Sequence, residues 1–317
     1  MTKRRKWIIG TIVGVVVVAV AALAIVLTQG PHGQPVPPAA PSQPSPSAGP
    51  VFAAKIDNVA EARPQTGLSS ADVVYVEPVE GGLTRLLAVY FGSRPDVLGP
   101  VRSARSSDIG VLAQYGQPVL AYSGAAPEIL PALRSASLVN ASPAEVPGAY
   151  FRDNGRPAPH NLYVHPAGLP GGTPPPADSV PRFGPVPTAG TPVSAYQVRY
   201  PAASYDFRWS PDSHRWAIFA DGAPLSTTEA GRLDAATVIE QRVDVRVGEP
   251  GESGAVANSP VAQTVGSGEA TILRDGQRFA ATWNRPAPQS PTRFLTTTGD
   301  PLPLAQGPVW ILLTAKS

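Results

Sequence analysis

Two arginines three positions apart stand in the segment "GPVRSARSSDIG", residues 99–110, and their spacing suggests anion binding. The segment follows an apolar strand, "LLAVYF", and a helix is predicted to begin near Ser107. In α/β sheets, ligands commonly bind beyond the carboxyl ends of the strands. Arg102 and Arg105 could hold a phosphate or carboxylate there, beside the helix N-terminus. Alternatively, each arginine pairs with a carboxylate and fixes the loop.

Further polar side chains could complete this site. Ser123 follows the apolar segment "PVLAY" and precedes a second predicted helix, so it would face the same cleft if the two strands are neighbours. The segment "FRDNGRPAPHNLYVHP" gathers Arg152, His160 and Asn161 in one proline-rich loop, which is typical of a binding site. His160 could act as a general acid or base, or it could bridge loop carbonyls in a structural role.

Two glutamates stand close to these arginines in the predicted hairpin "ADVVYVEPVEGGLTRLLAVYFG". With Gly81-Gly82 as a two-residue turn, Glu80 and Arg85 become diagonal neighbours on one face. A structural ion pair between them is the first interpretation, and Glu80 as a general base is the second. Glu77 falls on the opposite face, so the two glutamates are not expected to act as an acid–base pair.

These observations define two sets of candidate residues, and neither implies a metal or a cofactor. A zinc site is not expected, because Asp153, His160 and His165 do not match a known ligand spacing. The candidate catalytic residues are Glu80 and His160. The candidate ligand-binding residues are Arg85, Arg102, Ser103, Arg105, Ser123, Arg152, His160 and Asn161.

The elements that must position these residues predict two folded domains. Between residues 51 and 170, apolar strands alternate with helical segments, which favours an α/β domain whose mixed sheet is covered by helices. Residues 171–190 are rich in proline and glycine and are expected to form a linker or long loop. Residues 191–317 predict a smaller β-rich domain, with hairpins in "YDFRWSPDSHRWAIFADG" and at Asp275-Gly276 and a buried final strand, "GPVWILLT".

The N-terminus predicts attachment to a membrane. Residues 1–6 form a basic flank, and residues 7–28 are 22 positions without charge, which as a helix would span roughly 33 Å. The flank is expected in the cytoplasm and the rest of the chain outside, on a proline-rich linker of residues 29–50. The alternative is a cleavable signal peptide, because Ala22 and Ala24 would permit cleavage.

Composition excludes several classes of protein. The chain has no cysteine, which rules out a cysteine nucleophile, disulfides, thiolate metal ligands and a lipidated cysteine as the anchor. The net charge is +2, but Lys3, Arg4, Arg5 and Lys6 supply four positive charges, which leaves 21 basic against 23 acidic residues elsewhere. Nucleic acid is not an expected partner, because binding it requires a basic face.

Longer segments carry a resemblance to a known family. For a first domain these are "ARPQTGLSSADVVYVEPVEGGLTRLLAVY", "GPVRSARSSD" and "PHNLY", and for a second they are "HRWAIFADG", "GSGEATILRDGQRFAATWNR" and "QGPVWILL". Together they resemble the YerB-like family of bacterial envelope lipoproteins over residues 52–315. The matching positions are Glu80, Gly81, Gly82, Thr84, Arg85, Arg102, Ser103, Arg105, His160 and Asn161.

This family is a domain of unknown function, so the resemblance implies an extracytoplasmic, membrane-tied protein but no reaction. The chain departs from the family pattern in two places. A predicted transmembrane helix replaces the lipidated cysteine, and Val76 stands where a glutamate is expected, with Glu77 next to it.

We therefore expect a single-pass plasma-membrane protein that faces outward and binds an anionic ligand, such as a cell-wall glycan or a phosphate-bearing polymer. One alternative is a hydrolase acting on such a polymer, and another is a structural partner in an envelope complex. An enzyme should gather Glu80, Arg102, Arg105 and His160 around one cleft, whereas a structural protein would have every arginine paired and buried.

Overall fold

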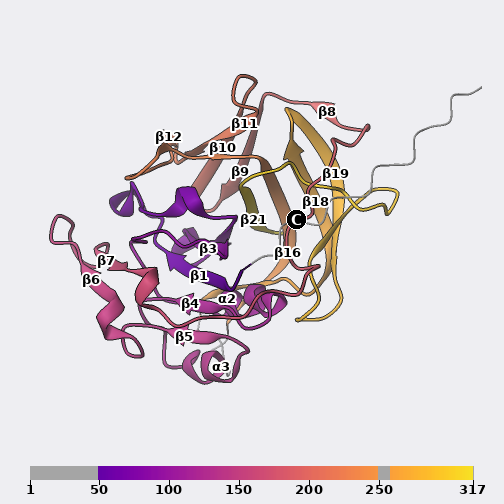
Figure 1. Cartoon of the computed structure of the whole chain (residues 1–317). Helices are drawn as coiled ribbons and strands as arrows, with labels where there is room; N and C mark the ends of the chain where they lie inside the picture. Colours follow the sequence, from indigo (N-terminus) through magenta and orange to yellow (C-terminus); the bar gives the residue numbers. More distant parts are fainter. Residues whose placement is uncertain (1–48, 249–257, 317) are drawn as a thin grey trace, which may run out of the picture. The chain divides into compact units, whose positions relative to one another are not determined.

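The computed structural model describes residues 49–248 and 258–316, and in them one mixed sheet of twelve strands runs through both predicted domains (Figure 1). Two short strands attach to its sides, because β17 (Pro260–Gln263) pairs with β16 and β8 (Thr191–Pro192) pairs with β19. The remaining strands follow the order β20 (Arg293–Thr296), β19 (Gln277–Arg285), β18 (Gly266–Arg274), β16 (Thr237–Val247), β21 (Val309–Ala315), β2 (Val73–Pro78), β3 (Thr84–Phe91), β1 (Val51–Ile56), β4 (Val119–Ala121) and β5 (Val139–Ala141).

The predicted membrane anchor, residues 7–28, lies outside the described residues, as does nearly all of the predicted linker that follows it. Among the residues that are described, no helix is both long and apolar enough to cross a membrane. The anchor therefore stays a prediction.

The last strand of the chain joins the two sequence halves. β21 lies between β2 and β16 and is parallel to both, so Val309 has Val73 and Thr237 as its register partners. Six of its seven residues are buried, as expected for a strand that is apolar on both faces. The prediction of a buried final strand is confirmed, and this strand makes one sheet of the two halves.

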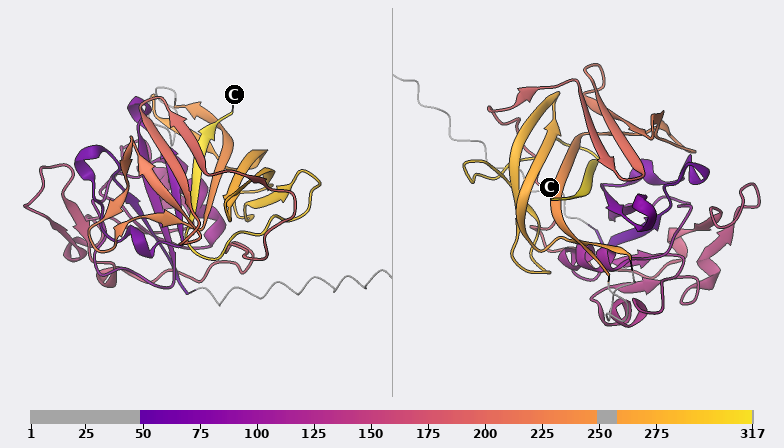
Figure 2. Two further views of the ribbon diagram at one scale, coloured as in Figure 1. Left: turned by 90° about the horizontal axis from the view of Figure 1, so that it is seen from above. Right: turned by 180° about the vertical axis from the view of Figure 1, so that it is seen from behind.

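A smaller five-stranded sheet, formed by described residues of the second half, covers one face of the main sheet (Figure 2). Its inward aromatic residues Tyr205, Phe207 and Trp216 pack in one cluster with Phe52 and Tyr90 of the main sheet. The predicted hairpins at residues 210–213 and at Asp275-Gly276 are both confirmed. The strands of this layer are β9 (Ala195–Tyr200), β10 (Ala203–Ser210), β11 (Arg215–Ala220), β12 (Ala223–Pro224) and β15 (Asp234–Ala235), and β13 (Ser226–Thr227) pairs with β14 (Gly231–Arg232) nearby.

Two short helices pack on the other face, against the first-half strands (Figure 1). α2 (Ser106–Leu112) begins near the predicted residue and continues into the 3-10 turn η4 (Ala113–Tyr115), and α3 (Leu130–Ser135) follows β4. The expectation of a mixed sheet is confirmed. The expectation of a helical cover is wrong in extent, because α2 and α3 have only seven and six residues and the described chain consists mainly of strands. The first helical segment ends at Gly116, which adopts a positive φ of 79° directly after η4. The other 3-10 turns are η1 (Ala60–Ala62), η2 (Leu68–Ser70), η5 (Pro147–Ala149) and η6 (Pro166–Gly168).

The loop with the predicted histidine belongs to a separate hairpin. β6 (Tyr150–Arg152) pairs with β7 (Leu162–Val164), and His160 lies just before β7. The Val101 N–H donates to the Leu162 carbonyl at 2.7 Å, so β7 lies against the segment that carries the arginines.

The first hairpin of the sheet differs from its predicted register by one residue. Glu77 lies directly opposite Arg85, because a 3-10 turn, η3 (Glu80–Gly82), takes the place of a two-residue turn. The predicted cross-strand pairing of Glu80 with Arg85 is therefore wrong. Glu80 lies in the turn, and Glu77 shares a face of the sheet with Arg85.

The two glycines of this turn give a matched pair of substitutions. Gly81 and Gly82 have φ values of 69° and 72°, but a Cβ on Gly81 would meet open space, whereas one on Gly82 would lie 2.7 Å from the Pro201 Cβ of the β9–β10 turn. We expect Gly81→Ala to lower the free energy of unfolding by about 1–2 kcal/mol through its backbone alone. Gly82→Ala should cost about 1–3 kcal/mol more, because it also displaces the β9–β10 turn. Urea denaturation measures both, and equal losses would contradict this close approach.

Candidate functional site

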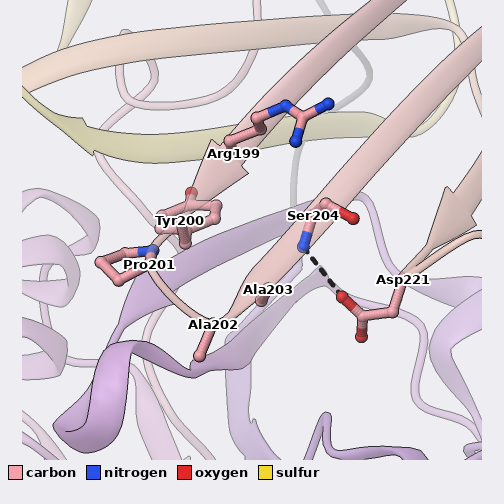
Figure 3. A pocket seen from close by; sticks show the side chains of 7 residues that line it. All are labelled: Arg199, Tyr200, Pro201, Ala202, Ala203, Ser204 and Asp221. Atoms are coloured by element: carbon pink, nitrogen blue, oxygen red, sulfur yellow. Dashed lines mark hydrogen bonds between the residues drawn. The ribbon is translucent and has the colours of Figure 1, made fainter.

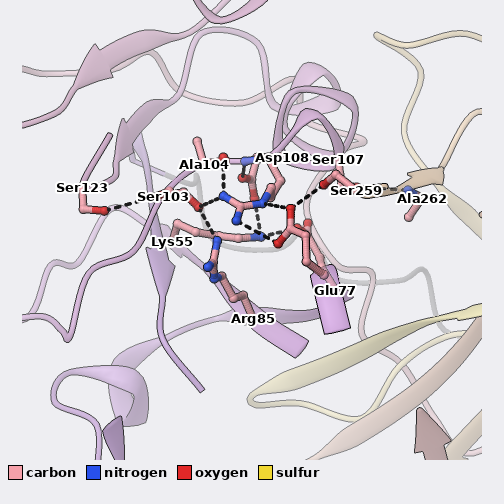
Figure 4. Close-up of polar contacts among 12 residues, drawn as sticks. Lys55, Glu77, Arg85, Ser103, Ala104, Ser107, Asp108, Ser123, Ser259 and Ala262 are labelled. Carbon is pink, nitrogen blue, oxygen red and sulfur yellow. Dashed lines mark hydrogen bonds and ion pairs between the residues drawn. The ribbon is translucent and has the colours of Figure 1, made fainter. Parts of the chain in front are cut away.

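The candidate site lies at one edge of the main sheet. Asp57 follows β1, Ser123 follows β4, and the chain between β3 and α2 returns across this edge. The returning segment is held by backbone hydrogen bonds: the Arg102 N–H donates to the Lys55 carbonyl, and the Ser123 N–H donates to the Arg102 carbonyl, both at 2.9 Å. β1 lies between β3 and β4, so the two strands expected as neighbours are separated by one strand. The hydroxyls of Ser103 and Ser123 nevertheless lie 3.4 Å apart (Figure 4).

Arg105 pairs with Glu80 in a two-point contact. Its Nε and Nη2 lie 2.8 and 2.9 Å from the two Glu80 carboxylate oxygens, and the Ser259 hydroxyl donates to the same carboxylate at 2.6 Å. Burial alone would raise the pKa of Glu80, but the hydrogen bonds from Arg105 and Ser259 outweigh burial and lower this pKa to about 2. Glu80 is therefore a fixed carboxylate, and it has Arg105 as its partner where the sequence suggested Arg85.

Arg102 and His160 meet on a buried aspartate. The Asp57 side chain is 2% exposed, and its Oδ2 lies 2.7 Å from His160 Nδ1 and 3.2 Å from Arg102 Nε. Its Oδ1 accepts a hydrogen bond from the Asn58 N–H at 2.9 Å. The contact with Arg102 is an ion pair without hydrogen-bond geometry. A carboxylate thus orients the histidine, and the loop carbonyls considered for that role do not.

Arg85 stands apart from these two pairs. Its guanidinium donates to the Ser103 carbonyl at 3.2 Å, and among the described residues it forms no ion pair with a carboxylate (Figure 4). Burial, together with the positive charges of Arg105 and Arg102, lowers the pKa of Arg85 to about 10. In the described part of the chain, the edge therefore gathers three guanidinium groups and two carboxylates, and Arg85 is the cation without a carboxylate partner.

Two other predicted contributors are engaged elsewhere. Arg152 donates to the Asn161 side chain at 2.6 Å, so this pair holds the β6–β7 hairpin together. The N-terminus of α2 does not offer free donors to an anion in the way the sequence suggested. The Asp108 carboxylate already accepts the Arg105 N–H there, at 2.6 Å, and the helix has only seven residues.

Beneath the arginines lies a fully buried ion cluster that the sequence analysis missed (Figure 4). Lys55, Glu77 and Asp108 have no exposed side-chain surface. The Lys55 ammonium donates to Glu77 and, at 2.8 Å, to Asp108. A signal was available in "VFAAKI": a lysine on an inner apolar strand must be paired, because an isolated buried charge is costly.

Of the two carboxyl groups in this cluster, Glu77 is the one whose pKa is raised. Burial and then the Asp108 carboxylate raise the pKa of Glu77 to about 8, although Lys55 opposes the shift. Its Oε1 has no hydrogen-bond partner. Burial beside Asp108 therefore favours the protonated form of Glu77 in the folded protein.

The other features of the described residues add little to the site. No group of three or more histidine, aspartate or glutamate side chains among them could hold a metal ion. A depression of about 390 Å³ lies at the β9–β10 turn, and Arg85, Arg102 and Arg105 are not among its lining residues. The Ser204 N–H donates to Asp221 there at 2.8 Å (Figure 3). Asp221 also pairs with Arg63 at 2.9 Å, so the depression presents no uncompensated charge from this aspartate.

Comparison with known proteins identifies a family whose function is unknown. The chain matches the N-terminal domain of DUF3048, a protein of unknown function, over residues 39–174 and the C-terminal domain over residues 196–311. It is 34% identical to YerB, a candidate lipoprotein of Bacillus subtilis (strain 168), over 111 residues, which are 34% of this chain and 33% of that relative. The sequence match thus spans about a third of the length of YerB.

The fold comparison covers more of the chain. The crystal structure of the YerB protein from Bacillus subtilis superposes with a TM-score of 0.72 at 18% sequence identity, covering 85% of this chain and 92% of that one. At this identity the likeness establishes the fold alone.

The buried cluster predicts an unusual pH dependence of stability. Glu77 has a pKa of 4.5 when unfolded and about 8 when folded, so its contribution is complete below pH 4.5 and is lost as the pH rises through about 8. Glu77→Gln mimics the protonated acid and removes this dependence. Relative to the variant, the native protein should lose about 1 kcal/mol of unfolding free energy per pH unit across that window. Urea denaturation from pH 5 to 9 measures the difference, with the exposed Glu128→Gln as control; a flat difference would contradict the assignment.

Proposed function

The chain belongs to the two-domain DUF3048 family of unknown function, and from its site we propose that it binds an oxyanion through Arg85. The observation that carries this proposal is the charge balance at the sheet edge. Arg102 and Arg105 each have a carboxylate partner, whereas Arg85 has none among the described residues. A guanidinium that is partly desolvated and repelled by two others gains most from an added negative charge.

The two paired arginines would then shape the site. Glu80 holds the Arg105 guanidinium at two points, and Asp57 holds Arg102. The side chain of Arg105 is 13% exposed and that of Arg102 is 22% exposed, so both arginines can still present N–H groups to a ligand beside Arg85. A planar guanidinium suits phosphate and carboxylate oxygens equally well, so the chemistry common to both is a small oxyanion.

The predicted anchor and the name of the relative YerB support a place in the cell envelope. We propose that residues 7–28 hold the protein in the plasma membrane, with the described domains outside the cell. A cell-wall glycan or polymer bearing phosphate or carboxylate groups would then be the ligand. The relative YerB is named as a candidate lipoprotein, which is consistent with an envelope location.

The alternatives fit the site less well. A purely structural partner should have every arginine paired, and Arg85 departs from that pattern. Glu80 is a poor general base, because Arg105 and Ser259 occupy its oxygens and lower its pKa to about 2. Of the two candidate catalytic residues, His160 retains a ring nitrogen, Nε2, without a hydrogen-bond partner among the described residues.

Substitution of Arg85 tests the proposal on the full chain. Arg85→Met keeps the aliphatic stem and removes a charge that Arg102 and Arg105 repel, so stability without ligand should stay equal or rise. Dimethyl phosphate or acetate at 100 times its dissociation constant should stabilise the native protein by about 2.7 kcal/mol and leave Arg85→Met unchanged. Thermal unfolding at constant ionic strength measures both effects.

Two further variants serve as controls in this experiment. Arg199→Met removes an exposed arginine whose guanidinium donates to the Gln197 side chain, and it should keep the full anion effect. Arg105→Met should lower the unfolding free energy by about 1 kcal/mol, because Glu80 loses its two-point partner. If Arg85→Met is destabilised in the same way, or retains the anion effect, Arg85 is a structural residue and the proposal fails.

A further inference from the structure

We propose that this edge of the sheet hydrolyses a phosphate diester, with His160 as the general base. The proposal rests on the anion binding proposed above and adds to it a reaction and a substrate class. Three observations support it: the orientation of His160, the net positive charge of the arginine site, and the contact of Asp57 with both His160 and Arg102.

The histidine is oriented as a base should be. The buried Asp57 carboxylate lies 2.7 Å from His160 Nδ1, which places the ring proton on Nδ1 and leaves the lone pair on Nε2. Among the described residues, Nε2 has no hydrogen-bond partner, and the side chain is 18% exposed. The backbone keeps the ring in place, because the His160 N–H donates to the Pro157 carbonyl at 3.0 Å. An oriented imidazole with a free, solvent-reachable nitrogen is the usual form of a general base.

The charge of the site selects the substrate class. In the described part of the chain, Arg102 and Arg105 are balanced by Asp57 and Glu80, and Arg85 leaves one positive charge. One uncompensated charge matches a phosphate diester, which carries a single negative charge, better than a monoester, which carries about two.

Asp57 brings the base and the anion site together. The same oxygen, Oδ2, contacts both His160 Nδ1 and Arg102 Nε. The Arg85 guanidinium donates to the carbonyl of Ser103, the residue that follows Arg102, so Arg85 lies against the same segment. A diester held by Arg85 would therefore lie beside the free Nε2 of His160, with guanidinium groups near the oxygens that gain charge in the transition state.

The reaction balances with water alone. His160 Nε2 removes a proton from a water molecule as its oxygen bonds to phosphorus. The bond from phosphorus to one ester oxygen breaks, and the departing alkoxide takes a proton from the imidazolium. The products are a phosphate monoester and an alcohol, and the histidine returns to its neutral form. No metal, oxidant or second substrate is required.

The test compares turnover with binding in the full chain. Bis(4-nitrophenyl) phosphate serves as the diester substrate, 4-nitrophenyl phosphate as the monoester, and dimethyl phosphate as the binding probe. His160→Asn keeps a donor toward Asp57 and loses Nε2, so we expect kcat to fall about 100- to 10,000-fold while dimethyl phosphate binding is unchanged. His160→Gly should regain part of its turnover when imidazole is added, which a structural histidine would not show.

Two variants separate this inference from the proposed binding. His165→Asn is the matched control, since this histidine follows β7 and its Nδ1 lies 3.2 Å from a backbone carbonyl, that of Asp96; it should keep full turnover. Arg85→Met should lose both binding and turnover. If the native protein binds dimethyl phosphate but cleaves the diester no faster than His160→Asn, hydrolysis is overturned and binding stands. If it binds no anion, both proposals fail.

Discussion

A buried ammonium group holds together the elements that carry the site. Lys55 on β1 is fully enclosed, and its ammonium group donates to Glu77 on β2 and to Asp108 on α2. Breaking a buried ion pair leaves an unpaired buried charge and costs about 3–5 kcal/mol. Separation of β1, β2 and α2 would therefore be strongly destabilising. Asp108 also accepts the Arg105 N–H, and Arg105 in turn holds Glu80. The buried Lys55–Asp108 pair therefore helps to fix the position of Arg105.

The site also depends on both halves of the chain. Ser259, from the second half, donates to Glu80 of the first. Asn58, which follows β1, donates to Thr84 at 3.0 Å and also to Tyr205 of the covering sheet. The Ser259–Glu80 and Asn58–Tyr205 contacts cross the boundary between the two family domains, and β21 makes the same connection within the sheet. The two domains are separate in sequence, but they build the edge of the sheet together.

Charge is distributed unequally at this edge. Two of the three guanidinium groups have carboxylates that hold them in place, and these pairs stabilise the loop before α2. The third, Arg85, is partly desolvated and faces two like charges, an arrangement that opposes folding. Proteins tolerate such local costs mainly where a ligand or a reaction needs them. The same edge carries His160 with one free ring nitrogen, so binding and acid–base groups occur side by side.

The sequence by itself determined the strands β1, β2, β3, β4 and β21, the Asp275-Gly276 turn, the start of α2 and the arginine segment, because neighbouring residues decide these features. It did not predict β16, the longest strand of the described residues. It missed the register of the first hairpin, since Gly81-Gly82 accepts positive φ in turns of different length. It also missed the ion pairs of the site. Lys55 meets Asp108 across 53 residues, and Asp57 meets His160 across 103. Only the tertiary structure decided which charged side chains form ion pairs and which one has no carboxylate partner. These side chains meet only when the sheet brings the ends of its strands together.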